Sequence, residues 1–256
     1  MAKKVVVRTS AGIAGFDRAP TERIPRLLLT LSGLAKTGKT RFALTAPAPV
    51  YVQSFDTGTE GVIEQFAAAK DVYLRDYRLD LDENADEKQT LDAAKAAWAQ
   101  FSADFHRLVD GGARTIVWDH ADEVWEIIRL KEWGQLTNKP QFYSVVNAQY
   151  RALVRSVYNA SHPVNLILLH KMKESWGEDS KGRPTKTGDY EVAGFKDRGY
   201  LTQGEIRLSR VGSLFKAEVV DSRHNAGLIG MEYEGEDVNF PKIASDIFGN
   251  EPEDWQ

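Results

Sequence analysis

Residues 27–46 read LLLTLSGLAKTGKTRFALTA, and this stretch decides the predicted fold. It contains a G-x-x-x-x-G-K-[ST] phosphate-binding loop, Gly33-Leu34-Ala35-Lys36-Thr37-Gly38-Lys39-Thr40. The apolar run before the loop predicts a buried strand, and residues 40–46 predict a short helix that ends at Pro47. A glycine turn between a strand and a helix points backbone N–H groups at one anion. The stretch therefore predicts an α/β fold with a triphosphate site.

Each polar residue of the loop has a predicted task. Lys39 can reach the β- and γ-phosphates, and the hydroxyl of Thr40 can bind Mg²⁺. A chance glycine-rich turn is the alternative, but the motif residues stand at the required spacing between a strand and a helix. The predicted nucleotide-binding residues are Gly33, Leu34, Ala35, Lys36, Thr37, Gly38, Lys39, Thr40 and Arg41.

Composition limits the class of protein. The 256 residues suit one large domain with extensions, and the absence of cysteine excludes disulfides and favours a reducing compartment. No apolar run approaches the ~20 residues of a membrane span, and no signal peptide is apparent at the N-terminus. We therefore expect a cytoplasmic protein without a membrane partner.

The net charge of −4 is unevenly distributed. Residues 1–26 contain six Lys or Arg and two acids, whereas residues 231–256 contain eight acids and only Lys242 as a base. A nearly neutral middle argues against a simple electrostatic nucleic-acid binder. We predict an N-terminal arm at 1–25, a core at 26–230 and an acidic tail at 231–256.

Two further strands are expected to end at the phosphate site. Residues 114–119, RTIVWD, form an apolar strand that ends in Asp119, a Walker-B pattern that would place Asp119 opposite Thr40 as a metal ligand. Residues 50–55 form another strand, which precedes Asp56 and Glu60. Functional groups gather at the carboxyl ends of parallel strands, so Glu60 is predicted to activate the attacking water. A cap for the helix that begins near Val62 is an equal alternative for Glu60, and Glu123 is a rival for the water-activating role.

A third core strand, residues 163–169, ends at His170 and Lys171. His170 could sense the γ-phosphate or simply bind the backbone. Residues 172–200 have no lasting periodicity, which predicts an irregular loop that is functional or mobile. Bases could stack on its aromatic residues and phosphates could meet its basic ones, or it could be a disordered surface loop. The candidate DNA contacts are Lys173, Trp176, Lys181, Arg183, Lys186 and, from an earlier loop, Lys139.

Other predicted elements complete the chain. Helices are expected at 87–109, 122–133 and 144–160, and a β-hairpin is expected at 204–220 because its residues alternate at period two around Val211-Gly212-Ser213. Arg207, Lys216 and Arg223 could reach a neighbouring subunit's γ-phosphate, or be ordinary surface charges. Phe16 and Ala19 in the N-terminal arm could plug a neighbouring subunit, or pack on their own domain.

The ordered segments GLAKTGKT, SFDTGTEG, TIVWDH, LILLHKMKESW and KAEVVDSRHN resemble the RecA-like phage ATPases called AAA-type nucleotide-binding proteins, which include Sak-type single-strand annealing proteins. The resemblance covers about residues 24–230. It implies a RecA-like core that binds ATP and Mg²⁺, assembles with like subunits and handles single-stranded DNA. It also implies that residues 172–200 match a DNA-binding loop by position, and that Phe16-Asp17-Arg18-Ala19 matches a subunit-linking motif.

The sequence as a whole predicts a RecA-like P-loop fold, with a mostly parallel sheet flanked by helices and a C-terminal antiparallel hairpin. The predicted function is an ATP-hydrolysing phage recombination protein that binds single-stranded DNA as a homo-oligomer, with catalytic residues Glu60, Lys39, Asp119 and His170. A single-strand DNA-binding protein is a further candidate partner. A small-molecule kinase and an ATP-dependent loading factor remain as alternatives.

Overall fold

The computed structural model describes residues 25–55, 61–77, 79, 86–134, 143–178 and 181–255. The strands are β1 (Leu28–Gly33), β2 (Val50–Ser54), β3 (Val72–Asp76), β4 (Thr115–Asp119), β5 (Asn165–Glu178), β6 (Pro184–Val192), β7 (Gly204–Val211), β8 (Leu214–Ser222) and β9 (Glu232–Glu234). The helices are α1 (Lys39–Leu44), α2 (Ile63–Ala67), α3 (Glu87–Asp110), α4 (Ala121–Trp133), α5 (Tyr143–Tyr158) and α6 (Phe240–Phe248). Short 3-10 turns include η2 (Lys196–Tyr200), η4 (Gly235–Asp237) and η5 (Pro252–Trp255).

One sheet organises the molecule, with strands in the order β3-β2-β4-β5-β1-β7-β8-β9. The strands from β3 through β1 to β7 pair in parallel, and β7, β8 and β9 pair antiparallel. The register aligns Ser54 with Asp119, Asp119 with Leu169, and Ser32 with His170. The carboxyl ends of these strands therefore meet at one edge of the sheet.

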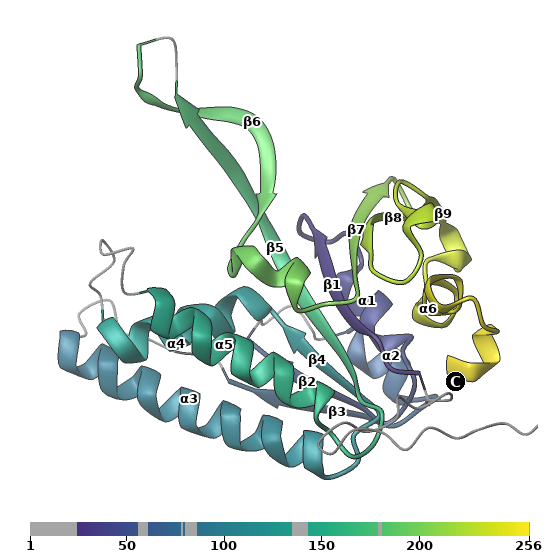
Figure 1. Ribbon diagram of the computed structural model, residues 1–256, viewed down its shortest axis with the longest axis horizontal. Helices are drawn as coiled ribbons and strands as arrows, with labels where there is room; N and C mark the ends of the chain where they lie inside the picture. The colour runs from purple at the N-terminus through teal and green to yellow at the C-terminus, as the bar shows by residue number, and fades with distance from the viewer. Residues whose placement is uncertain are drawn as a thin grey trace, which may run out of the picture.

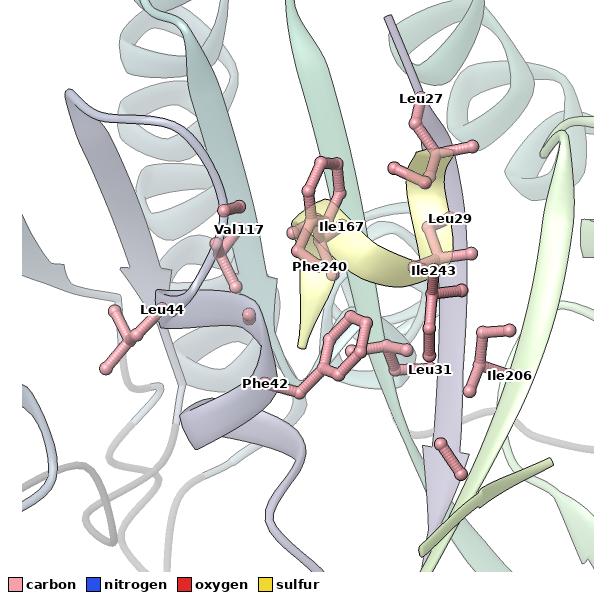
Figure 2. Close-up of a cluster of buried hydrophobic side chains, with 14 of the residues drawn as sticks. Leu27, Leu29, Leu31, Phe42, Leu44, Val117, Ile167, Ile206, Phe240 and Ile243 are labelled. Atoms are coloured by element: carbon pink, nitrogen blue, oxygen red, sulfur yellow. The ribbon is translucent and has the colours of Figure 1, made fainter. Parts of the chain in front are cut away.

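The central strands are apolar on both faces because helices cover both faces of the sheet. Leu29 and Leu31 of β1 pack with α1 and α6, whereas Leu28 packs with α3, α4 and α5 on the other side. Figure 1 shows the same two layers around the sheet. In Figure 2, Phe42 of α1 and Phe240 of α6 meet over Leu31 and Ile167. The predicted mostly parallel sheet with flanking helices and an antiparallel C-terminal hairpin is confirmed.

Residues 231–256 were expected to form an acidic tail, but they contribute β9 and α6 to the fold. β9 pairs with β8, and the apolar face of α6 lies in the core through Phe240, Ile243 and Ile247. Trp255 is fully buried, and its ring contacts those of Phe240 and Phe248. The acidic composition of the segment hides its buried apolar residues, because the acidic side chains lie on the side away from the core.

The prediction of an irregular loop at 172–200 was wrong. β5 continues past the sheet edge to Glu178, turns, and returns as β6, so that the pair forms a two-stranded hairpin that projects from the body of the molecule (Figure 1). Both faces of the hairpin meet solvent over most of its length, so its sequence has no apolar alternation. Ladder hydrogen bonds and cross-strand ion pairs of Lys173 with Glu191 and of Lys186 with Glu174 stabilise it instead.

Two smaller elements had no signal strong enough for a prediction. β3 is an edge strand of five residues, four of them exposed, and α6 is a short helix within the acidic segment. Among the described helices, none combines the length and apolar character that crossing a bilayer requires.

Replacing Trp255 tests whether the C-terminal segment is part of the core. Trp255→Ala removes a fully buried indole, and we expect a loss of about 3–5 kcal/mol in the free energy of unfolding. The control is Trp176→Ala, because Trp176 on the hairpin is 63% exposed and its loss should change the free energy by no more than about 0.5 kcal/mol. Urea unfolding measures both. Equal stability of Trp255→Ala and the wild type would show that the segment does not support the fold.

Candidate nucleotide-binding site

The phosphate-binding loop links β1 to α1. Its curvature depends on two residues with positive φ, Gly38 at 91° and the non-glycine Lys36 at 63°. The ammonium of Lys39 lies inside the curve and donates to the carbonyl oxygens of Gly33 and Leu34, each at 2.9 Å. Lys39 is therefore held where a phosphate cradled by the loop would meet it.

The loop is braced by the neighbouring β7–β8 hairpin. A Cβ atom at Gly33 would lie 2.6 Å from the carbonyl oxygen of Leu208, and one at Gly38 would lie 2.8 Å from the ring of Phe215. Only glycine permits these approaches. Arg41 lies over the ring of Phe215 at 5.8 Å, which adds a cation–π contact beside the loop. The C-terminal strands therefore fix the shape of the phosphate site.

Thr40 and Asp119 come together as the motif spacing predicted. The hydroxyl of Thr40 donates to Oδ2 of Asp119 at 3.0 Å, although the two residues are 79 positions apart. A hydroxyl and a carboxylate this close can serve one Mg²⁺, which needs only one or two protein oxygens beside phosphate and water. Within the described residues no cluster of three or more His, Asp or Glu side chains could hold a metal by itself. The donor set thus fits a metal that arrives with a nucleotide.

His120 and Asp122 form a cluster with Asp119 that sequence reasoning did not identify. His120 directly follows Asp119 and has a left-handed φ of 70°, a conformation that L residues rarely adopt. This turn directs its ring between two carboxylates, with Nε2 3.8 Å from Asp119 and Nδ1 3.8 Å from Asp122. The succession of Asp119, His120 and Asp122 was visible in the sequence, but the backbone turn was not.

Asp122 joins this cluster to the projecting hairpin. Burial acts to raise the pKa of Asp122, but the imidazole of His120 and the ammonium of Lys171 outweigh that effect and hold the pKa below its usual value. Its Oδ1 accepts from the backbone N–H of Lys171 at 3.4 Å. A Cβ at Gly194 would lie 2.9 Å from Asp122, so the chain that directly follows β6 packs against it. Asp122 therefore contacts β5 and the segment after β6, where the hairpin leaves the sheet.

His170 is fully buried at the same place. Its Nδ1 lies 3.0 Å from the carbonyl oxygen of Ala193, which bridges the outgoing and returning strands, while Nε2 is buried without a hydrogen-bond partner among the described residues. Burial lowers the pKa of His170 to about 4, although the Asp122 carboxylate acts in the opposite direction. Its ring is neutral near pH 7 and has no exposed surface with which to touch a phosphate directly.

Glu123, a rival candidate for activating water, forms an ion pair at the base of the projecting hairpin. Its Oε1 accepts from the ammonium of Lys171 at 2.7 Å. Glu60, the other candidate for activating water, lies outside the described residues, as do Asp56, Lys139, Phe16 and Ala19.

The candidate DNA contacts of 172–200 lie along the hairpin. Trp176 is 63% exposed, with the ammonium of Lys186 6.0 Å from its ring. Lys173 and Lys186 pair with Glu191 and Glu174 across the two strands. Lys181 and Arg183 lie near the far end, where β6 begins. The hairpin also exposes Tyr190, another of the aromatic residues on which bases were predicted to stack.

Each of the three candidate trans cations contacts its own chain. Arg207 lies 3.6 Å from Glu218, Lys216 pairs with Glu234, and Arg223 donates to the carbonyl oxygen of Tyr200 at 3.1 Å. Glu234 raises the pKa of Lys216. Any approach to a neighbouring subunit would have to exchange these partners.

With the phosphate loop, the Thr40–Asp119 contact and the strand order established, comparison with protein families identifies the class. A profile described as "AAA domain" matches residues 26–194, more than half of the chain. The chain belongs to the AAA domain family. It is thus a P-loop ATPase domain, and the matched region runs from β1 to the end of the β5–β6 hairpin.

Other comparisons are more distant. The sequence matches none of the curated proteins. Among solved structures, the RadB recombinase is similar with a TM-score of 0.43 and 14% identity, covering 81% of this chain and 86% of that one. An ATPase of the type III secretion system of pathogenic bacteria is similar with a TM-score of 0.41 and 11% identity, covering 72% of this chain and 51% of that one.

The buried His170 predicts a pH dependence of stability. Its pKa falls from an ordinary 6.5 to about 4 on folding, so the unfolded chain binds more protons between these values. The free energy of unfolding is therefore unaffected by this group above pH 6.5. It decreases as the pH falls toward 4, by about 3 kcal/mol in all. His170→Gln keeps a donor for Ala193 but cannot titrate, so its unfolding free energy should fall less steeply over this range. Parallel urea titrations from pH 7 to pH 4 measure the difference, and identical slopes would contradict the assignment.

Proposed function

We propose that this chain is an ATP-hydrolysing recombination protein of phage type that binds single-stranded DNA as a homo-oligomer and promotes strand annealing. The course of β5 is the observation that supports it best. The strand passes beside Asp119 and the phosphate loop, and then continues without a break into a projecting hairpin with exposed Trp176 and Tyr190. One strand thereby connects a triphosphate site to a surface suited to stacking on bases.

In this proposal ATP is held by residues 33–41, and Thr40 and Asp119 hold its Mg²⁺. Binding of the metal and the γ-phosphate would change the interactions of the Asp119 carboxylate, which lies beside His120 and Asp122. At the base of the hairpin Asp122 accepts from Lys171 of β5, and His170 bonds Ala193 directly after β6. A small shift at Asp119 would therefore reach the hairpin through packed groups. His170 acts as a positioning residue here. Hydrolysis would relax the hairpin base and release the strand.

The exposed aromatic and basic side chains of the hairpin are proposed to contact different parts of the DNA. Trp176 and Tyr190 offer faces for bases, while Lys181 and Arg183 lie where phosphates would pass. Lys173 and Lys186 have carboxylate partners across the hairpin, which reduces their attraction for phosphate. Stacking, which is worth about 1–3 kcal/mol per base, therefore contributes more than net charge in this proposal.

Self-association is proposed to use the open edge of the sheet. β3 is the edge strand and exposes Tyr73 at 50% and Leu74 at 46%. An exposed parallel edge with apolar side chains offers pairing sites to another chain. The arm with Phe16 and Ala19 is the proposed counterpart from a neighbouring subunit, and Arg207, Lys216 and Arg223 remain candidates for reaching the neighbour's nucleotide. A single-strand DNA-binding protein is a further proposed partner.

The first test measures retention of a labelled oligo-dT by the full chain, with ATP and without it. We expect retention only with ATP, and loss in Lys39→Ala because this change removes the ammonium that meets the phosphates. The matched control is Lys242→Ala, which removes an equal charge from α6. Equal retention by Lys39→Ala, or none by any protein, would refute the proposal.

The second test concerns the group that activates water. Glu60→Gln should lower the rate of ATP hydrolysis at least tenfold with little change in ATP affinity, because general-base catalysis typically contributes about 10²–10⁴-fold. Glu123→Gln should keep most of the rate, because Glu123 is paired with Lys171. Phosphate release measures both. If only Glu123→Gln lost most of its hydrolysis rate, Glu123 rather than Glu60 would be the group that activates water.

Product analysis separates the remaining alternatives. Free phosphate supports an ATPase, whereas a phosphorylated acceptor would identify a small-molecule kinase. Stimulation of hydrolysis by single-stranded DNA argues against a loading factor that engages only a protein partner.

A further inference from the structure

Two hollows flank the base of the β5–β6 hairpin, and their charges differ. One, with a volume of about 530 Å³, is lined by four acidic residues and two lysines. The other, of about 520 Å³, lies between the phosphate loop, the hairpin base and β7. We call the second one the loop-side cleft; its lining residues are Leu34, Ala35, Lys36, Thr37, Met172, Tyr190, Arg207, Leu208, Ser209, Arg210 and Gly212.

The loop-side cleft has the chemistry of a polyanion site. Lys36, Arg207 and Arg210 line it, and no acidic residue does. Within the described part of the chain, neither Lys36 nor Arg210 has a carboxylate within salt-bridge distance, while Arg207 shares its charge with Glu218 at 3.6 Å. The hollow on the opposite side of the hairpin is lined by four acids and only two lysines, which makes it the less favourable side for a phosphate backbone. Charge therefore selects one side of the hairpin.

The floor of the cleft suits bases. Tyr190 is 48% exposed and Leu34 is 45% exposed, and Met172 also lines the cleft. Aromatic and apolar surface rimmed by cations is the combination with which proteins hold single strands without reading sequence. The volume also falls in the range of ligand pockets, on the order of 300–1,000 Å³.

We propose that the loop-side cleft binds single-stranded DNA, with a base against Tyr190 and Met172 and phosphates against Arg207 and Arg210. This inference rests on the proposed function and deepens it by placing the strand on one side of the hairpin. Residues 34–37 form one wall of the cleft and also belong to the phosphate loop. Nucleotide inside the loop fixes this wall, so ATP and DNA bind on opposite surfaces of one short segment and favour each other's binding.

The brace behind the loop supports the same coupling. Leu208 and Phe215 of the β7–β8 hairpin approach Gly33 and Gly38 closely, and that hairpin also contains Arg207 and Arg210. The guanidinium of Arg210 lies 5.0 Å from the ring of Phe215. The cations of the cleft and the phosphate loop are therefore anchored to one another.

The test uses the full chain, a fluorescent oligo-dT and a non-hydrolysable ATP analogue, with anisotropy followed over a range of NaCl concentrations. Tyr190→Ala should weaken binding about 5- to 150-fold, the loss expected for one stacked base, whereas Tyr190→Phe should bind within about twofold of the wild type. Arg210→Glu should weaken binding and reduce the slope of log K against log salt by about 0.7 for the lost phosphate contact. Arg155→Glu, on the exposed side of α5, makes the same charge change away from the cleft and should bind as the wild type does.

Affinity for the ATP analogue, measured without DNA, should be equal in the wild type, both Tyr190 variants and Arg155→Glu. If the wild type binds DNA and Tyr190→Ala and Arg210→Glu bind equally well, the cleft is not the site, although the proposed function stands. If the wild type does not bind, the proposed function fails and this inference fails with it. If Arg210→Glu abolishes self-association while DNA affinity per protomer is unchanged, the cleft is an interface between copies and the inference is overturned.

Discussion

The hydrogen bond between the buried His170 ring and the carbonyl oxygen of Ala193 is the constraint on which the rest of the account depends. It joins β5 to the residue directly after β6, at the point where β5 leaves the core. Asp122 contacts β5 and the same segment after β6, and it lies three residues after the Asp119 that meets Thr40. These packed groups are the physical path for the proposed coupling between the phosphate site and the hairpin base.

Part of this site was predictable from the sequence for physical reasons. A phosphate loop needs glycines and a lysine at fixed spacing, and strands buried on both faces appear as continuous apolar runs, so β1, β4, β5 and the contact of Thr40 with Asp119 followed from local patterns. The β7–β8 hairpin was equally visible, because it alternates at period two.

Other parts depend on contacts that no local pattern expresses. The β5–β6 hairpin has solvent on both faces and is stabilised by ion pairs between strands, so it lacks the periodicity by which strands are found. α6 and Trp255 contact the core within a segment whose composition is acidic. The left-handed turn at His120 is visible only in the backbone, and it is what brings three side chains together.

The two sides of the hairpin base differ in charge. On one side lie Asp122 and other acids, most of them paired with lysine or arginine; on the other lie Lys36 and Arg210 beside the phosphate loop. A polyanion that follows the hairpin toward the body is therefore guided to the side on which the nucleotide binds. In the proposed function, ATP and a DNA strand are linked through the shared phosphate loop as well as through the groups at the hairpin base.

The central claim is that nucleotide at the phosphate loop tightens the base of the β5–β6 hairpin. Hydrogen–deuterium exchange, with and without a non-hydrolysable ATP analogue and Mg²⁺, tests this most directly. The account predicts slower exchange at the amides of residues 33–41 and also at Lys171 and Ala193, with the second effect absent in Thr40→Ala. Protection confined to residues 33–41 would contradict it.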